Sequence, residues 1–96
     1  MSKTVEELSA NFEQDGVLVV KELDRVVLTK GAWATVVFKY QDRDRKTGEY
    51  GAPKISLRRY RKMSGEYRQQ NKFTISSMKQ AAQLRDLLDD WLAQDA

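Results

Sequence analysis

The chain of 96 residues contains no cysteine and no histidine. The absence of cysteine excludes disulfide bonds and thiolate nucleophiles. The absence of histidine removes the commonest general base and the commonest metal ligand, and with it every Ser-His-Asp or Cys-His catalytic arrangement. The sequence therefore predicts a protein that is not an enzyme and that binds no cofactor and no metal.

Long apolar runs and clustered glycines are also missing. No apolar run approaches the roughly 20 residues of a membrane-spanning helix, and the acidic N-terminal segment, residues 1–16, contains no apolar signal core. The five glycines stand singly, which excludes the dinucleotide-binding fingerprint and the phosphate loop. We therefore expect a cytoplasmic protein with no membrane contact, and an association with the nucleoid stays open.

What the chain does contain is typical of one folded domain. It is 41% hydrophobic and 32% charged, which argues against bulk disorder. A chain of this length buries one modest core, and assembly into a homodimer would enlarge that core. We therefore expect a single domain, residues 1–96, that forms a homodimer.

The middle of the chain is predicted to form β-strands. The predicted strands are residues 17–22, 25–30, 34–42, 54–62 and 72–76, which are rich in β-branched and aromatic side chains or alternate between apolar and polar ones. The first two are equally well one long bent strand. A turn-forming segment at residues 63–71 comes before the last strand.

Capping boxes predict a helix at each end of the chain. The box that begins at Thr4 starts a short helix within residues 1–16, and the box that begins at Ser77 starts an amphipathic helix over residues 77–92. The predicted fold is therefore α+β. It is an antiparallel meander sheet of four to five strands with a C-terminal amphipathic helix and a short N-terminal helix.

The strand at residues 54–62 alternates between two faces. Ile55 and Leu57 lie on one face, which we expect to begin as the core face. Arg59 shares that face, so we expect it at a sheet edge or an interface. The side chains on the other face are Lys54, Ser56, Arg58, Tyr60 and Lys62. This basic face, with an aromatic ring between positive charges, is typical of a surface that binds a polyanion with stackable bases. An ordinary exposed strand face is the alternative.

The sequence also predicts where four other large side chains lie in the fold. In the last strand, Phe73 and Ile75 are expected to point inward. Trp33 is either an exposed stacking platform or a cap over the core, and we favour the cap. Trp91 lies on the apolar stripe of the helix, where it is core or a dimer contact.

Charge is distributed unevenly along the chain. Residues 1–24 carry a formal charge of −4, residues 25–72 carry +9 and residues 73–96 carry −2. The concentration of positive charge in the predicted strands indicates an anionic partner. The alternative is that acidic helices and a basic sheet neutralise each other within the fold.

Binding of single-stranded nucleic acid is the function that these patterns favour. Lysine and arginine side chains would hold phosphates, and Tyr60 would stack on a base. The candidate nucleic-acid-binding residues are Arg25, Lys39, Arg43, Arg45, Lys54, Arg58, Tyr60, Lys62, Arg68 and Lys72.

Two other functions stay open. One is a protein-interaction module whose basic sheet docks an acidic protein. The other is a small enzyme in which Asp86, Asp89 and Asp90 hold magnesium, although without histidine or cysteine nearby these carboxylates suit solvent better.

Part of the chain resembles a known family. Residues 55–60 have the form apolar–polar–apolar–Arg–x–aromatic, residues 73–76 precede a capped helix, and residues 21–26 form an early strand. In this order they resemble the C-terminal domain of the transcriptional positive cofactor 4 family, including its small bacterial members. The resemblance covers residues 21–92 and departs from the family at Lys72, where the family usually has glycine.

The resemblance implies a four-stranded antiparallel sheet followed by one amphipathic helix, assembled into homodimers. It also implies that the β-surface binds single-stranded DNA or RNA with little sequence preference, in an accessory role in transcription or replication. Arg58 and Tyr60 fall on the phosphate-contacting and base-stacking positions. Arg25 and Lys39 are weaker matches.

Overall fold

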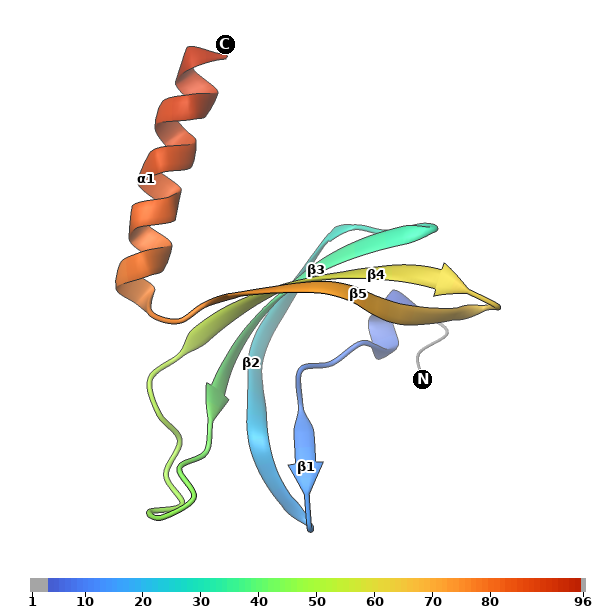
Figure 1. Cartoon of the computed structure of the whole chain (residues 1–96), viewed down its shortest axis with the longest axis vertical. Helices are drawn as coiled ribbons and strands as arrows, with labels where there is room; N and C mark the ends of the chain where they lie inside the picture. Colours follow the sequence, from blue (N-terminus) through green and yellow to red (C-terminus); the bar gives the residue numbers. More distant parts are fainter. Residues whose placement is uncertain (1–3, 96) are drawn as a thin grey trace.

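The computed structural model describes residues 4–95 and has one five-stranded sheet with a helix at its C-terminal end (Figure 1). The strands are β1 (Phe12–Gln14), β2 (Val17–Thr29), β3 (Trp33–Asp42), β4 (Lys54–Met63) and β5 (Glu66–Ile75). They pair antiparallel in chain order, β1-β2-β3-β4-β5. The predicted α+β meander is confirmed.

Two tight turns join neighbouring strands. Asp15 and Gly16 have φ values of 53° and 78°, and Ser64 and Gly65 have 54° and 80°. Two consecutive residues with positive φ form the type I′ turn, whose twist matches that of antiparallel strands. Because β5 begins directly after the second turn, the segment predicted to be turn-forming, residues 63–71, is mostly strand, and the predicted short strand at 72–76 is only its end.

The predicted short N-terminal helix is present as one turn of 3-10 helix, Val5–Glu7, which is shorter than the predicted range of residues 1–16. The chain then extends into β1. The side chain of Thr4 makes no cap to the backbone. Since short helices are marginal on their own, the segment is held instead by burying Val5 and Leu8 against the sheet.

β2 is one long strand, the second of the two alternatives for residues 17–30. Its pairing with β3 shifts register at Leu23 and again at Leu28. Such bulges bend a strand and increase its twist. They accompany the strong curl of the sheet in Figure 1.

The core lies on one face of this curled sheet, which we call the inner face. Its buried side chains are Ala34, Val36, Phe38 and Tyr40 of β3, Ser56 and Tyr60 of β4, and Tyr67 of β5. In the β3–β4 ladder, Phe38 lies opposite Ser56 and Ala34 lies opposite Tyr60. Directly opposite residues share a face, so this register turns the basic side of β4 inward.

The opposite, outer face carries Ile55, Leu57 and Arg59 of β4. The prediction that Ile55 and Leu57 begin the core face is therefore wrong. Phe73 lies opposite Leu57 on the outer face and is exposed, against the expectation that it points inward, whereas Ile75 is buried.

The C-terminal helix is present as α1 (Met78–Gln94) and projects from the end of β5 (Figure 1). The Ser77 hydroxyl accepts a hydrogen bond from the Gln80 N–H at 3.1 Å, as the capping box predicts. No residue of α1 is buried, so Trp91 is not part of the core. Within residues 4–95, no helix has the length and apolar character needed to cross a membrane.

Candidate nucleic-acid interface

An aromatic and basic cluster occupies the outer face near the β4–β5 turn. Trp33 begins β3 and lies opposite Arg61 of β4, which in turn lies opposite Arg68 of β5. Arg59 is two residues before Arg61 and points to the same face. We call Trp33, Arg59, Arg61 and Arg68 the Trp33 cluster. Trp33 is 42% exposed and lies on the face opposite the core, so the favoured cap over the core is wrong.

Two guanidinium groups hold the indole ring. The guanidinium carbon of Arg59 lies 4.6 Å from the ring centre, and that of Arg61 lies 5.5 Å away. Both distances fall within the range of cation–π attraction, worth about 0.5–1 kcal/mol each at exposed sites. The arginines thereby fix the orientation of an exposed aromatic face.

No carboxylate of the described residues pairs with the arginines of this cluster. Within residues 4–95, the ion pairs join Lys54 to Asp42 and Arg85 to Asp86, and neither involves the Trp33 cluster. Three arginines that lack a carboxylate partner create a local positive potential. Planar guanidinium groups suit phosphate oxygens, and an exposed indole suits a nucleobase.

Tyr60, the predicted stacking residue, is in a different environment. It is only 5% exposed on the inner face, and its burial raises the pKa of the phenol above its ordinary value, with an opposing contribution from Arg58. A base cannot stack on a ring whose faces pack in the core. The exposure that the stacking role needs is therefore absent.

The other predicted cations on the inner face are engaged by the fold. Arg58 donates from Nε to the Ser56 hydroxyl at 3.1 Å, and its guanidinium carbon lies 5.1 Å from the centre of the Phe38 ring. The Lys62 ammonium lies 5.5 Å from the centre of the Tyr67 ring. These two cations cover aromatic core residues.

Arg25 and Lys54 also have partners within the fold. Nη1 of Arg25 donates to the carbonyl of Leu8 at 2.6 Å and to that of Val5 at 3.3 Å, which ties the N-terminal segment to the inner face. Lys54 bonds the Asp42 carboxylate at 2.7 Å, and this bond raises the pKa of Lys54. Lys72 lies opposite Arg58 and is exposed on the inner side of β5.

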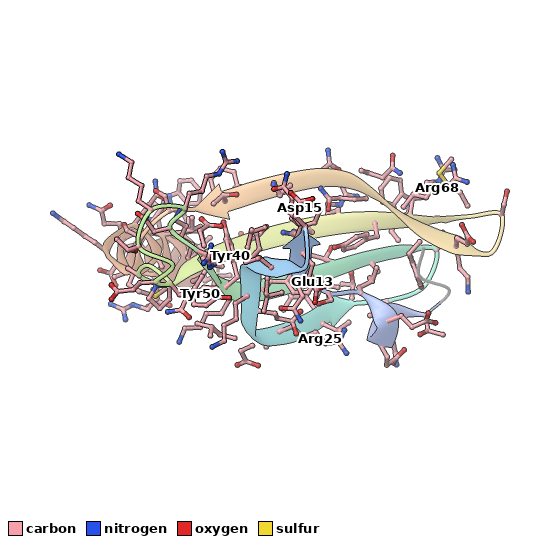
Figure 2. All side chains as sticks on the ribbon, turned by 90° about the horizontal axis from the view of Figure 1, so that it is seen from below. Glu13, Asp15, Arg25, Tyr40, Tyr50 and Arg68 are labelled. Carbon is pink, nitrogen blue, oxygen red and sulfur yellow. The ribbon has the colours of Figure 1, made fainter. Side chains whose placement is uncertain are left out.

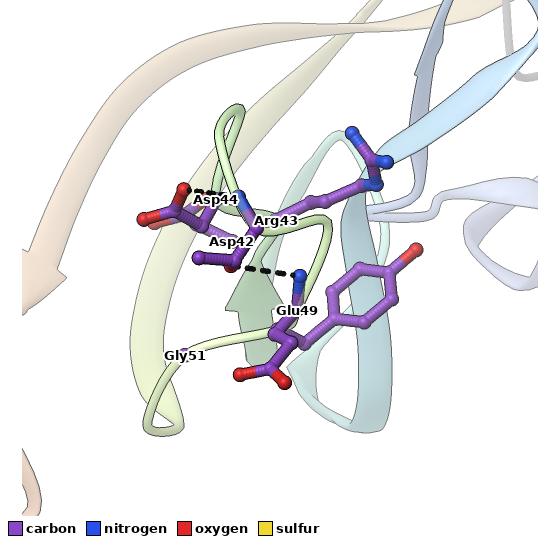
Figure 3. Close-up of a pocket in the computed structure, with 7 residues that line it drawn as sticks. Asp42, Arg43, Asp44, Glu49 and Gly51 are labelled. Atoms are coloured by element: carbon purple, nitrogen blue, oxygen red, sulfur yellow. Dashed lines mark hydrogen bonds between the residues drawn. The ribbon is translucent and has the colours of Figure 1, made fainter.

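Arg43 and Arg45 lie in the loop between β3 and β4, at the other end of the sheet from Arg68 (Figure 2). This loop frames an open pocket of about 430 Å³ (Figure 3). The Arg43 guanidinium packs so closely on Gly48 that a Cβ there would lie 3.0 Å from Nη2. Arg45 is exposed.

The carboxylate of Asp44, which lines this pocket, accepts its hydrogen bonds from within the loop. The Asp44 carboxylate accepts hydrogen bonds from the Lys46 N–H at 2.7 Å and the Thr47 N–H at 3.0 Å, and these bonds lower the pKa of Asp44. In the part of the chain that the structure describes, no group of three or more acidic residues could hold a metal ion. The pocket is an ordered surface loop of mixed charge.

The structure thus brings together a different set of residues from the predicted one. Of the ten predicted binding residues, Arg68 joins the Trp33 cluster, and Lys39 lies exposed elsewhere on the outer face. Sequence reasoning did not place Arg59 and Arg61 among the candidate binding residues, and it weighed Trp33 as an exposed stacking platform but favoured a cap over the core. The sequence does show that Arg59 and Arg61 alternate onto the same side of one strand. Only the β3–β4 register shows that this side also carries Trp33.

Comparison of the chain with models of known protein families, with curated proteins and with solved structures finds no match. The resemblance to the positive cofactor 4 family therefore stays a prediction. The function is argued below from the site alone.

Proposed function

We propose that the protein binds single-stranded DNA or RNA through the Trp33 cluster. Arg59, Arg61 and Arg68 hold the phosphate backbone, and Trp33 stacks on a base. The observation that carries this proposal is the exposed Trp33 with two guanidinium groups near its ring, 4.6 and 5.5 Å from the ring centre, and with no carboxylate partner for any arginine of the cluster among residues 4–95. Such a surface is sequence-tolerant, because every base has a π-face.

The proposed ligand is a single strand because a duplex hides the faces of its bases. A duplex would offer the arginines its phosphates but leave Trp33 without a stacking partner. A single strand satisfies both parts of the cluster at once. In the cell, we propose a cytoplasmic accessory role in transcription or replication, where single strands are exposed.

Fluorescence tests this proposal. The chain has two tryptophans, so Trp91→Phe leaves Trp33 as the sole indole reporter. We expect single-stranded oligonucleotides to quench its emission more strongly than duplexes of equal charge. Quenching should weaken steeply as salt rises, because the arginines displace counterions from phosphates. Unchanged emission together with no gel shift at low salt would refute nucleic-acid binding.

Docking of an acidic protein is the second candidate function, and the same three unneutralised arginines favour it. The two candidate ligands, a nucleic acid and an acidic protein, differ in whether they carry bases that can stack on Trp33. Polyglutamate and an oligonucleotide of matched charge separate them, because only the oligonucleotide offers stacking to Trp33. Equal affinity for the two polyanions would favour the acidic protein.

We also propose that the protein acts as a homodimer. The exposed apolar side chains of α1, including Trp91 and Leu92, support this proposal, because exposed apolar side chains that are grouped together mark interaction surfaces. Light scattering of the purified protein tests it. A mass of twice the chain's 11.1 kDa is expected, and a mass of 11.1 kDa at micromolar concentration would refute the homodimer.

A further inference from the structure

A second exposed aromatic ring lies on the outer face. Phe73 of β5 is 61% exposed, a larger fraction than Trp33. It lies opposite Leu57, which in turn lies opposite Val37 of β3. Val37 is four residues after Trp33 on the same strand, so both rings point to one face of the sheet. Leu57 and Val37 are partly buried, which leaves Phe73 as the most exposed member of this cross-strand row.

An arginine lies midway between the two rings. Trp33 of β3 lies opposite Arg61 of β4. Phe73 of β5 lies opposite Leu57 of β4. Arg59 is the residue of β4 halfway between Arg61 and Leu57, and it points to the same face. Trp33, Arg59 and Phe73 therefore form a diagonal across three neighbouring strands, which we call the outer diagonal.

The outer diagonal matches a short run of nucleotides in length. Neighbouring strands are about 4.8 Å apart, so β3 and β5 are about 9.6 Å apart. Four residues along a strand add about 13 Å, so the two rings are about 16 Å apart. Bases stacked as in a DNA strand rise about 3.4 Å each, so this distance corresponds to about five base steps, and an extended strand covers it in fewer. One short single strand can therefore place a base on each ring.

The charges beside the outer diagonal suit a phosphate backbone. Arg59 is exposed, and its ladder neighbours Thr35 and Asn71 are uncharged. Of the carboxylates on β2 to β5, Glu66 and Asp24 are on the outer face, and both lie beyond the ends of the diagonal. Glu66 is at the β4–β5 turn, and Asp24 is beside the bulge of β2. A strand that follows the diagonal passes an arginine and no carboxylate.

We propose that the bound single strand crosses the outer face along this diagonal, with one base stacked on Trp33, a phosphate held by Arg59 and a second base stacked on Phe73. The inference rests on the nucleic-acid binding proposed above, and it adds a second stacking residue and a path for the strand. Nucleic acid is the occupant that these residues favour, because the diagonal continues the Trp33 cluster and has a cation at its centre. Stacking on both rings is sequence-tolerant, but it requires a strand of about six nucleotides or an extended one slightly shorter.

The dependence of affinity on oligonucleotide length tests the second stacking contact. In the Trp91→Phe background, quenching of Trp33 reports binding at one end of the diagonal. Phe73→Ala should weaken binding of an octanucleotide by about 5- to 150-fold, because one stacking contact is lost. It should leave binding of a dinucleotide unchanged, because a single base step of about 3.4 Å does not join the two rings. The salt slope should equal that of the parent, since no charge is removed.

Phe12→Ala is the matched control. Phe12 is 56% exposed and belongs to β1, at the other edge of the sheet. Both alanine variants alter exposed side chains, so both should keep the circular dichroism of the parent, and Phe12→Ala should also keep its affinity for the octanucleotide. An equal loss of affinity in the two variants would overturn the second contact. So would a loss in Phe73→Ala that is equally large for the dinucleotide.

Mass and cross-linking measurements separate stacking from an effect on assembly. If light scattering shows that Phe73→Ala has a smaller mass than the parent, Phe73 acts through contacts between copies and the inference is overturned. An octanucleotide with a single 5-iodouracil should attach to Trp33 on irradiation at one position of the label. It should attach to Phe73 when the label is moved by about three to five nucleotides. No attachment to Phe73 at any position refutes the path.

The same measurements distinguish failure of this inference from failure of the proposed function. A parent protein that does not bind the octanucleotide at low salt refutes nucleic-acid binding itself. Binding that is weakened by Trp33→Ala but not by Phe73→Ala refutes only the path along the outer diagonal.

Discussion

Replacing Trp33 and Arg61 one at a time separates the stacking part of the Trp33 cluster from its ionic part. Trp33→Ala removes the exposed indole but no charge. Stacking on an aromatic side chain contributes about 1–3 kcal/mol per base, so the affinity for a single-stranded oligonucleotide should fall by about 5- to 150-fold. The slope of log affinity against log salt should stay unchanged, because the same arginines still hold phosphates.

Arg61→Gln should have the opposite signature. Each phosphate neutralised on a single strand contributes about −0.7 to the salt slope, so three arginines give about −2 and two give about −1.4. At 0.1 M salt this difference corresponds to about fivefold weaker binding, and it should apply equally to oligonucleotides of any sequence. Fluorescence anisotropy of a labelled oligonucleotide at several salt concentrations measures both affinity and slope.

Lys72→Gln is the matched control for the lost charge. Lys72 is exposed like the cluster arginines but lies on the inner side of β5, opposite Arg58. It should leave the salt slope close to that of the parent. Two results would refute the site: an unchanged slope for Arg61→Gln, or an equal change of slope for Lys72→Gln.

Three further predictions concern the rest of the molecule. Tyr60→Phe should leave oligonucleotide affinity unchanged, since the ring is buried, whereas Tyr60→Ala should lower the free energy of unfolding in urea by about 3–5 kcal/mol through the cavity that it leaves. Arg25→Met removes the hydrogen bonds to two backbone carbonyls of the N-terminal segment and should lower the free energy of unfolding by about 2–3 kcal/mol in the same assay. Backbone N–H groups lower the pKa of Asp44 below its ordinary 3.8. The ionised carboxylate therefore stabilises the fold at pH values above 3.8. This stabilisation is lost as pH falls through the lower pKa of the folded state. Asp44→Asn should therefore reduce the difference in Tm between pH 7 and pH 3, and an unreduced difference would contradict the assignment.

Elements with strong local signals were predictable from the sequence. β3 alternates between apolar and mixed side chains over its whole length, and α1 combines a capping serine with a regular stripe, so both were predicted within a residue or two at most boundaries. β5 was predicted too short because its polar run, residues 68–72, has low strand propensity. The ladder to β4 and the type I′ turn decide its structure instead.

The binding face could not be predicted because alternation tells which residues share a face, not which face is inner. Arg58 and Tyr60 were correctly placed together, as were Arg59 and Leu57. The choice between the two sides depended on the register of β3 and β4, which a long connecting loop does not fix. In the structure, Val36 and Phe38 draw the side of Tyr60 inward, and the arginines on the other side meet Trp33.

The meander order of the strands has a consequence for how the chain acquires its structure. Every ladder joins strands that are neighbours in sequence, so contact order is low and loop-closure entropy is small for most steps. The β4–β5 hairpin closes over the two residues Ser64 and Gly65 and brings Arg61 beside Arg68 without help from the rest of the chain. Trp33 joins only when β3 pairs across the 43–53 loop. We therefore expect the local hairpin to assemble the basic half of the proposed binding surface first, and the longer closure to add its aromatic half.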